Sequence, residues 1–267
     1  MPRMNTLEAR GLALRENLAA VKVRIGLAAE AAGRRAGALP ALVVVTKFHP
    51  AADVVLLRGL GVGDVGENRD QEAAAKAAEV ADASLRWHFI GQLQSNKAKS
   101  VVRYAHSVHS VDRAALVTAL GRAMATQQDL DDRPDLACYI QVDLSQAAPR
   151  SAGGGTAVFG TAGQGEAMGE QDARGGAAPS DVLRLAALVA GTPGLSLAGV
   201  MAVAPLGADP VPAFELLSRI SAAVVREHPG ATGISAGMSH DLEAAIAAGA
   251  THLRVGSDIL GPRPAVR

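Results

Sequence analysis

The amino-acid sequence predicts an α/β protein, a single-domain (β/α)8 TIM barrel preceded by one additional helix. Eight short apolar runs alternate with alanine-rich stretches of helical periodicity, which is typical of a parallel sheet. The first run, ALVVVT at 41–46, is continuously apolar, as in strands that are buried on both faces. The length of 267 residues suits one such barrel. An open, doubly wound sheet is the structural alternative.

The predicted elements follow one another in a regular order. Leu7, Leu14, Leu18, Val21 and Ile25 recur at helical spacing, so a long helix with one apolar stripe is expected over 4–36. Strands are predicted over residues 41–46, 64–66, 86–90, 107–110, 137–142, 197–202, 233–235 and 252–255. Helices are predicted over residues 51–60, 70–83, 96–104, 112–127, 181–191, 211–228 and 241–249.

One segment interrupts this order. Residues 145–180 contain nine glycines and nine alanines among 36 residues, with few large apolar side chains. Such a segment buries too little apolar surface to offset the entropy cost of ordering it. We therefore expect a flexible insert at 145–180 within a single domain spanning 1–267. A phosphate-binding role for Gly153–Gly155 is the weaker alternative, because no Lys-Ser or Lys-Thr pair follows them.

The composition excludes several classes of protein. Lys plus Arg and Asp plus Glu number 26 each, so the net charge is zero, which argues against a nucleic-acid-binding protein. The single cysteine, Cys138, excludes a disulfide framework. The first ten residues carry no apolar signal segment, and no apolar run reaches membrane-spanning length. A cytoplasmic protein with no membrane partner is expected.

In a barrel of this kind, functional side chains lie at the C-terminal ends of the strands. Lys47 follows the first strand directly, and desolvation there would lower the pKa of its amine and favour a Schiff base. The alternative is that Lys47 only extends its ammonium group to solvent. Asn68 follows the second strand and could contact a ligand, or else Asn68 or Asp70 caps the next helix.

The last two strands end in loops of the kind that often bind phosphate in such barrels. Ser235 and Ser257 offer hydroxyl groups there, and Gly256 allows close approach of a ligand to the backbone. Ser239 has the alternative role of capping the following helix. Arg254 shares a strand face with Gly256, so it needs a partner such as a ring nitrogen; an internal salt bridge with Glu67 is the alternative.

One ligand accounts for these groups together. An aldehyde suits Lys47, a phosphate suits the last two loops, and a ring nitrogen suits Arg254. That ligand is pyridoxal 5′-phosphate. Because an arginine retains its proton, the ring nitrogen would stay unprotonated, which weakens the cofactor as an electron sink.

Five motifs carry a resemblance to a known family: VVVTKFHP, VGENRDQE, WHFIGQLQSNK, GVMAVAP and ISAGMSHDLEAAIAAGATHLRVGS. In this order they resemble the YggS/PROSC family of pyridoxal phosphate homeostasis proteins. The resemblance implies a barrel similar to the N-terminal domain of alanine racemase, with a Schiff base on Lys47 and a ring-nitrogen contact from Arg254. It also implies phosphate contacts from Ser235, Gly256 and Ser257, helped by the Met238 backbone.

The sequence departs from the family pattern at three positions. Ser257 stands where Thr is usual, Ala236 where Met is usual, and Asp258 where a small apolar residue is usual. If the chain continues extended, Asp258 faces away from Ser257 and from the phosphate.

The resemblance implies a non-catalytic protein that stores or delivers the cofactor, and we expect a monomer that could pass it to client enzymes. The chain ends soon after the eighth strand, which leaves no room for the second domain of the related racemases and decarboxylases. The main alternative is a racemase-like enzyme, which needs a second acid or base; His88, His49 and Tyr104 are the candidates. A class I aldolase using Lys47 ranks third.

Overall fold

The computed structural model describes residues 6–35, 38–145 and 175–262. Its eight strands form a closed barrel in sequence order, and every neighbouring pair is parallel. The first strand pairs with both the second and the eighth, which closes the barrel and excludes the open sheet. The strands are β1 Ala41–Val45, β2 Asp64–Glu67, β3 Arg86–Phe89, β4 Ala105–Val111, β5 Leu136–Gln141, β6 Leu195–Met201, β7 Gly233–Ser235 and β8 His252–Val255.

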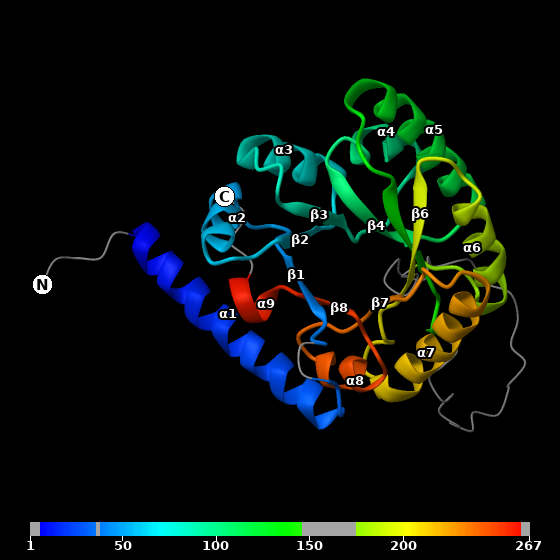
Figure 1. Ribbon diagram of the computed structural model, residues 1–267. Helices are drawn as coiled ribbons and strands as arrows, with labels where there is room; N and C mark the ends of the chain where they lie inside the picture. Colours follow the sequence, from blue (N-terminus) through cyan, green and yellow to red (C-terminus); the bar gives the residue numbers. More distant parts are fainter. Residues whose placement is uncertain (1–5, 36–37, 146–174, 263–267) are drawn as a thin grey trace, which may run out of the picture.

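The helices surround the barrel (Figure 1). This arrangement confirms the predicted fold class. The α-helices are α1 Thr6–Ala31, α2 Ala51–Gly59, α3 Asp70–Val80, α4 Ala98–Val101, α5 Ala114–Asp131, α6 Val182–Ala190, α7 Pro210–Glu227, α8 Leu242–Ala247 and α9 Ser257–Leu260, with 3-10 turns η1 Ser95–Lys97 and η3 Pro179–Asp181. No helix in these described ranges combines the length and apolar content that a membrane span requires.

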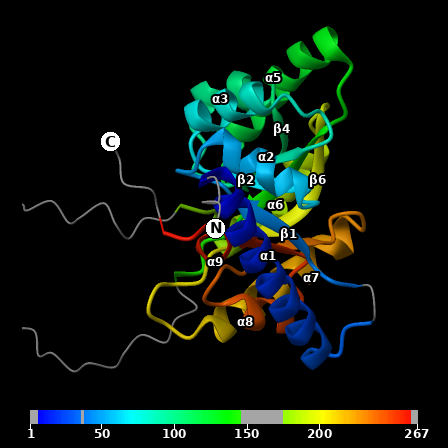
Figure 2. The same ribbon diagram turned by 90° about the vertical axis from the view of Figure 1, so that its left-hand side faces the viewer.

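Helix α1 packs along the outside of the barrel, against α2, α8 and α9 (Figure 2). Leu14, Leu18, Val21 and Ile25 are buried, as the apolar stripe predicts. Leu7 is 55% exposed, so the stripe does not reach the first turn. Three polar side chains at seven-residue spacing also bind α9, since Arg10, Asn17 and Arg24 contact three consecutive residues of that helix.

Two predictions about the chain path are wrong. The backbone after Gly256 does not continue extended, because Ser257–Leu260 forms the short helix α9. The predicted helix 96–104 is divided into η1 and α4, which ends at Val101.

The predicted flexible insert, 145–180, lies mainly outside the described residues, which omit 146–174 and with them Gly153–Gly155. Its described end belongs to the barrel wall. Ala177 forms a parallel bridge with Val142 and is buried, while the flexibility of the insert stays a prediction.

Candidate functional site

A cavity of about 300 Å³ lies at the C-terminal ends of β1 and β8. Five of the predicted residues line it: Lys47, Met238, Arg254, Gly256 and Ser257. They come from opposite ends of the chain and meet because β1 pairs directly with β8. The predicted amine, guanidinium and hydroxyl groups therefore line one cavity.

Lys47 lies in a tight turn two residues beyond β1, and its side chain is half-buried. The next residue, Phe48, has a φ of 70°, a left-handed conformation that is unusual for a bulky side chain. The Phe48 backbone N–H donates to Glu72 Oε1 at 2.5 Å, which helps to hold this conformation. The Lys47 Nζ lies 5.9 Å from the centre of the Phe48 ring.

A buried ion-pair cluster of Lys76, Glu67 and Glu72 contacts the backbone just before this turn. The Lys76 Nζ donates to the carbonyl oxygen of Thr46 at 2.8 Å, directly before Lys47. It also forms ion pairs with Glu67 at 2.8 Å and Glu72 at 2.6 Å. The Thr46 hydroxyl donates to Glu67 at 2.6 Å. Sequence reasoning missed Lys76, because an isolated lysine in a predicted helix carries no signal that it is buried.

Arg254 is 4% exposed and bonded to neutral acceptors. Its Nη1 donates to Ser235 Oγ at 2.6 Å, and its Nη2 donates to the Ala202 carbonyl at 2.8 Å. Burial lowers the pKa of Arg254 to about 10, which still leaves the guanidinium charged at neutral pH. Within the described residues no carboxylate forms an ion pair with Arg254. Glu67 is paired with Lys76. The predicted alternative, an Arg254–Glu67 salt bridge, is therefore wrong.

A second group of hydroxyls lies near the start of α9. Ser239 Oγ and Ser257 Oγ are 3.1 Å apart, and both residues line the cavity with Gly256. Ser239 does not cap α8, whose N-cap residue is Asp241. Sequence reasoning therefore missed Ser239 as a lining residue, because its position just before a helix fitted a capping role equally well.

Two predicted phosphate contacts have other partners in this structure. Ser235 is fully buried, and its hydroxyl contacts Arg254 and His109. The Met238 backbone N–H donates to Asp241 Oδ1 at 2.6 Å, although Met238 itself lines the cavity. Ser239 is thus the serine that contacts Ser257.

Asp258 is directed toward α1. Its Oδ2 forms an ion pair with Arg24 Nη1 at 3.0 Å, and its Oδ1 lies 3.5 Å from Ser257 Oγ. Arg24 also pairs with Glu243 and donates to the Ser239 carbonyl at 2.8 Å. The prediction that alternation along an extended chain turns Asp258 away from the phosphate is wrong in its reason, because Asp258 lies in the helix α9. The Arg24 guanidinium partly neutralises the Asp258 carboxylate.

Asn68 lies in a neighbouring recess of about 540 Å³, which Arg69, Gln92 and Lys97 also line. Neither Asn68 nor Asp70 caps α3, whose N-cap is Arg69 without a side-chain bond. A Cβ at Gly91 would lie 2.1 Å from the Asn68 carbonyl oxygen, so Gly91 is required for this close backbone contact.

The three acid or base candidates lie in different places. His49 lines the cavity, and burial lowers the pKa of its imidazole. His88 is a buried barrel residue bonded to Asp64, which begins β2 at the opposite end of the barrel. Tyr104 lies between α3 and α4, where its hydroxyl is 3.4 Å from Asp70. Only His49, of these three, borders the cavity.

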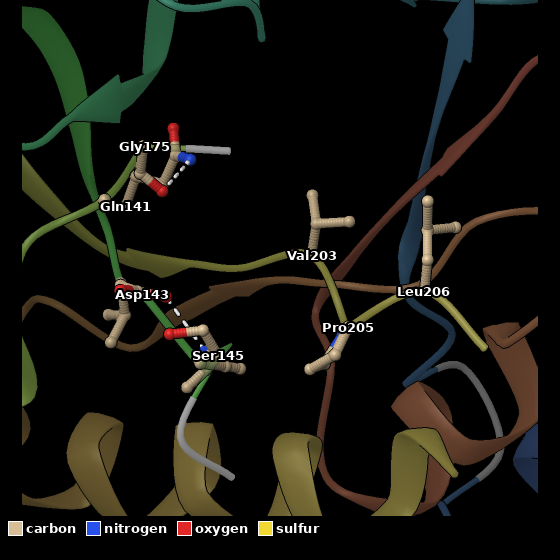
Figure 3. A pocket seen from close by; sticks show the side chains of 10 residues that line it. Gln141, Asp143, Ser145, Gly175, Val203, Pro205 and Leu206 are labelled. Atoms are coloured by element: carbon tan, nitrogen blue, oxygen red, sulfur yellow. Dashed lines mark hydrogen bonds between the residues drawn. The ribbon is translucent and has the colours of Figure 1, made fainter. Parts of the chain in front are cut away.

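A wider cavity of about 530 Å³ lies beyond the ends of β5 and β6. Figure 3 shows Gln141 bonded to Gly175, and Asp143 bonded to the Ser145 backbone, with Val203, Pro205 and Leu206 on the other wall. Its described lining includes no lysine or arginine. Its described lining therefore offers no amine for an aldehyde and no cation for a phosphate.

Comparisons with known proteins identify relatives along most of the chain. A pyridoxal phosphate homeostasis protein of Mycobacterium leprae is 40% identical over 255 residues, covering 92% of this chain and 91% of the relative. The structure of PipY from Synechococcus elongatus, solved with PLP bound, superposes with a TM-score of 0.71 at 28% identity, covering 93% of this chain and all of PipY.

An alanine racemase of Streptomyces coelicolor shares the fold at 15% identity, with a TM-score of 0.67 over 93% of this chain and 58% of the racemase. This comparison confirms the predicted likeness to the alanine racemase barrel. No family model matches the chain.

Proposed function

The chain belongs to the family of pyridoxal phosphate homeostasis proteins, and we propose that it binds pyridoxal 5′-phosphate in the β1–β8 cavity to store or deliver it. The observation that carries this proposal is the shared cavity of Lys47, Arg254 and Ser257. PipY, a structural neighbour, was solved with this cofactor bound, which supports the same ligand here.

The residues present fit the chemistry of the cofactor. The Lys47 amine suits the aldehyde, with which a lysine forms a Schiff base and releases water. The Arg254 guanidinium suits the ring nitrogen, since it is a buried cation that forms no ion pair with a carboxylate among the described residues. Ser239, Gly256 and Ser257 suit the phosphate, with hydroxyls and backbone close to one another.

We propose narrower roles for the remaining predicted residues. Met238 supplies an apolar wall of the cavity, and Ser235 acts through Arg254. Asn68 contributes from the adjoining recess.

The Arg254 environment limits the chemistry that a bound cofactor would support. When bound, pyridoxal phosphate supplies an electron sink, whose strength depends on protonation of its ring nitrogen. Arg254 remains charged near neutral pH and donates rather than accepts, so it does not supply that proton. An unprotonated ring nitrogen would suit simple holding of the cofactor, or racemase-like chemistry, better than decarboxylation.

A racemase-like activity is the second candidate, and the position of His49 favours it. His49 lines the cavity, and its Nδ1 lies 3.5 Å from Asp53 Oδ2. A catalyst would need this imidazole to move a proton on the substrate. Measurable racemisation of an amino acid that His49→Ala abolishes would support the enzyme, and no turnover by the loaded protein would support the carrier.

The first test is the absorption spectrum of the purified protein with added pyridoxal phosphate. We expect a visible band that is reducible by borohydride, with the resulting mass increase on the peptide containing Lys47. Lys47→Ala should lose the band, whereas Lys97→Ala, in the adjoining recess, should keep it. No uptake by the native chain would overturn the proposal.

Delivery needs its own measurement. The loaded protein is mixed with a cofactor-free pyridoxal-dependent enzyme, and recovery of that enzyme's activity is followed. Recovery faster than the cofactor escapes into a trapping solution would support direct delivery, and equal rates would contradict it.

A further inference from the structure

A continuous chain of polar side chains crosses the interior of the barrel beneath the cavity. We call it the interior relay; its members are Arg254, Ser235, His109, Ser107, His88 and Asp64. They come from five different strands, β8, β7, β4, β3 and β2. Interiors of such barrels are usually filled by branched apolar side chains, so a polar chain here calls for a physical explanation.

The upper half of the relay joins the cavity to the centre of the barrel. Arg254 Nη1 lies 2.6 Å from Ser235 Oγ, which in turn lies 2.8 Å from His109 Nδ1. His109 is fully buried, and burial lowers the pKa of its imidazole well below the usual value. It is therefore a neutral ring with one donor and one acceptor.

The lower half leads toward solvent at the opposite end. His109 Nε2 is 3.0 Å from both Ser107 Oγ and His88 Nδ1, and Ser107 Oγ is 2.7 Å from His88 Nδ1. His88 Nε2 is 2.8 Å from Asp64 Oδ1. Arg86, which is half-exposed, also pairs with Asp64. Although burial alone would raise the pKa of Asp64, hydrogen bonds from His88 and Arg86 hold it well below its usual range.

The two ends favour one direction for the hydrogen bonds between them. Arg254 can only donate and the ionised Asp64 can only accept. Ser235 accepts from Arg254 and can still donate its own proton to His109 Nδ1; a proton on His109 Nε2 then lies between the two facing ring nitrogens of His109 and His88, which are 3.0 Å apart. His109 then donates to Ser107 or directly to His88, and His88 donates from Nε2 to Asp64. Both routes give the same direction and the same two tautomers.

A metal site does not explain the gathered histidines. In the described ranges no group of three or more His, Cys, Asp or Glu side chains is arranged to hold a metal ion. An apolar filling would also be expected to be at least as stable as a buried polar network. The directed chain of donors is the property that an apolar filling would lack.

We propose that the interior relay is a positioning device for Arg254, with His109 as its central residue. It fixes Ser235 as an acceptor for the guanidinium and so keeps Arg254 directed at the ring nitrogen of the cofactor. This role rests on the proposed binding of pyridoxal phosphate. His109 and His88 are positioning residues, since neither lines the cavity.

The test on the loaded protein compares two substitutions at one position. His109→Leu removes both hydrogen bonds and should weaken pyridoxal phosphate binding roughly 10-fold, with a shift of the visible absorption band. His109→Gln keeps one acceptor and one donor, so it should restore affinity to within about 2-fold and restore the band. The control is His106→Gln on the same strand, because His106 is exposed and outside the relay. An unchanged His109→Leu protein, or a Gln variant as weak as the Leu variant, would overturn the proposal.

The cofactor-free protein provides an independent test. Nitrogen-15 NMR of the histidine rings should show a proton on Nε2 and none on Nδ1 in both His109 and His88. A proton on Nδ1 of either ring would overturn the relay even if the cofactor binds. A native protein that takes up no pyridoxal phosphate would instead overturn the proposed function and, with it, the role assigned to the relay.

Discussion

The two cavities at the C-terminal rim of the barrel differ in size and in chemistry. The β5–β6 cavity is the larger of the two, at about 530 Å³, but the polar side chains of its described lining are one carboxylate, one amide and one hydroxyl. The β1–β8 cavity is about 300 Å³ and contains Lys47, Arg254 and two serines. Volume therefore does not favour the β1–β8 cavity, whereas its convergent polar groups suit a charged aromatic ligand.

The two cavities also differ in the side chains that support their walls. Under β1, the Lys76 ammonium binds the Thr46 carbonyl and two glutamates, while the β5–β6 wall depends mainly on backbone pairing. The β1–β8 side is thus fixed by buried charges that must remain paired. The predictions below test the β1–β8 side of the barrel, with the β5–β6 side for comparison.

The largest expected effect comes from Lys76→Met. Glu67, which is 1% exposed, would lose its cation, and removing one partner of a buried pair costs about 3–5 kcal/mol of unfolding free energy. Chemical denaturation measures this, with Lys99→Met on the exposed face of α4 as the control. A loss below about 1 kcal/mol would show that the cluster does not hold the Lys47 turn.

Acid should destabilise the protein through the histidines inside the barrel. Burial lowers the pKa of His252 to about 4 and also lowers that of His109 well below its usual value, against about 6.5 in an unfolded chain. Their contribution is present above pH 6.5 and is lost as pH falls, because the unfolded state binds the protons. Unfolding free energy should drop by roughly 2–4 kcal/mol between pH 7 and pH 5. Equal stability at both pH values would contradict buried neutral imidazoles.

The next effect concerns binding in the two cavities. Arg254→Gln should weaken pyridoxal phosphate binding by about 2 kcal/mol, or roughly 30-fold, because a charge-assisted hydrogen bond is lost. Gln141→Ala, in the β5–β6 cavity, should leave affinity unchanged. Fluorescence or absorption titration of both variants distinguishes the sites, and the opposite ranking would move the ligand to the larger cavity.

The smallest effect is expected at Arg24. Its pairs with Glu243 and Asp258 are half-exposed, so Arg24→Ala should cost about 0.5–1 kcal/mol of unfolding free energy. Binding should weaken a few-fold, since Asp258 beside Ser257 loses its counter-charge. Lys22→Ala, on the exposed face of α1, is the control. Tighter binding in the Arg24 variant would contradict this role.

Sequence patterns predicted the barrel and the charged members of the cavity for a physical reason. Lys47 and Arg254 interrupt or end apolar strands, where a charge is costly and therefore informative. Ser239, Lys76 and α9 gave no such signal: a serine before a helix, a lysine within one and a four-residue helix are all ordinary locally. The Arg24–Asp258 pair joins residues 234 positions apart, and only the folded chain brings them together.

Helix α1 also has a consequence for synthesis. Arg10, Asn17 and Arg24 bind Leu260, Ile259 and Asp258, so part of the polar contacts of the first described helix form only with the last one. Strand β1, which precedes Lys47, likewise pairs on one side with β8. A nascent chain emerging from the ribosome therefore lacks these partners of α1 and β1 until residues 252–260 have been synthesised. Chaperone contact with α1 and late acquisition of cofactor binding are expected during translation.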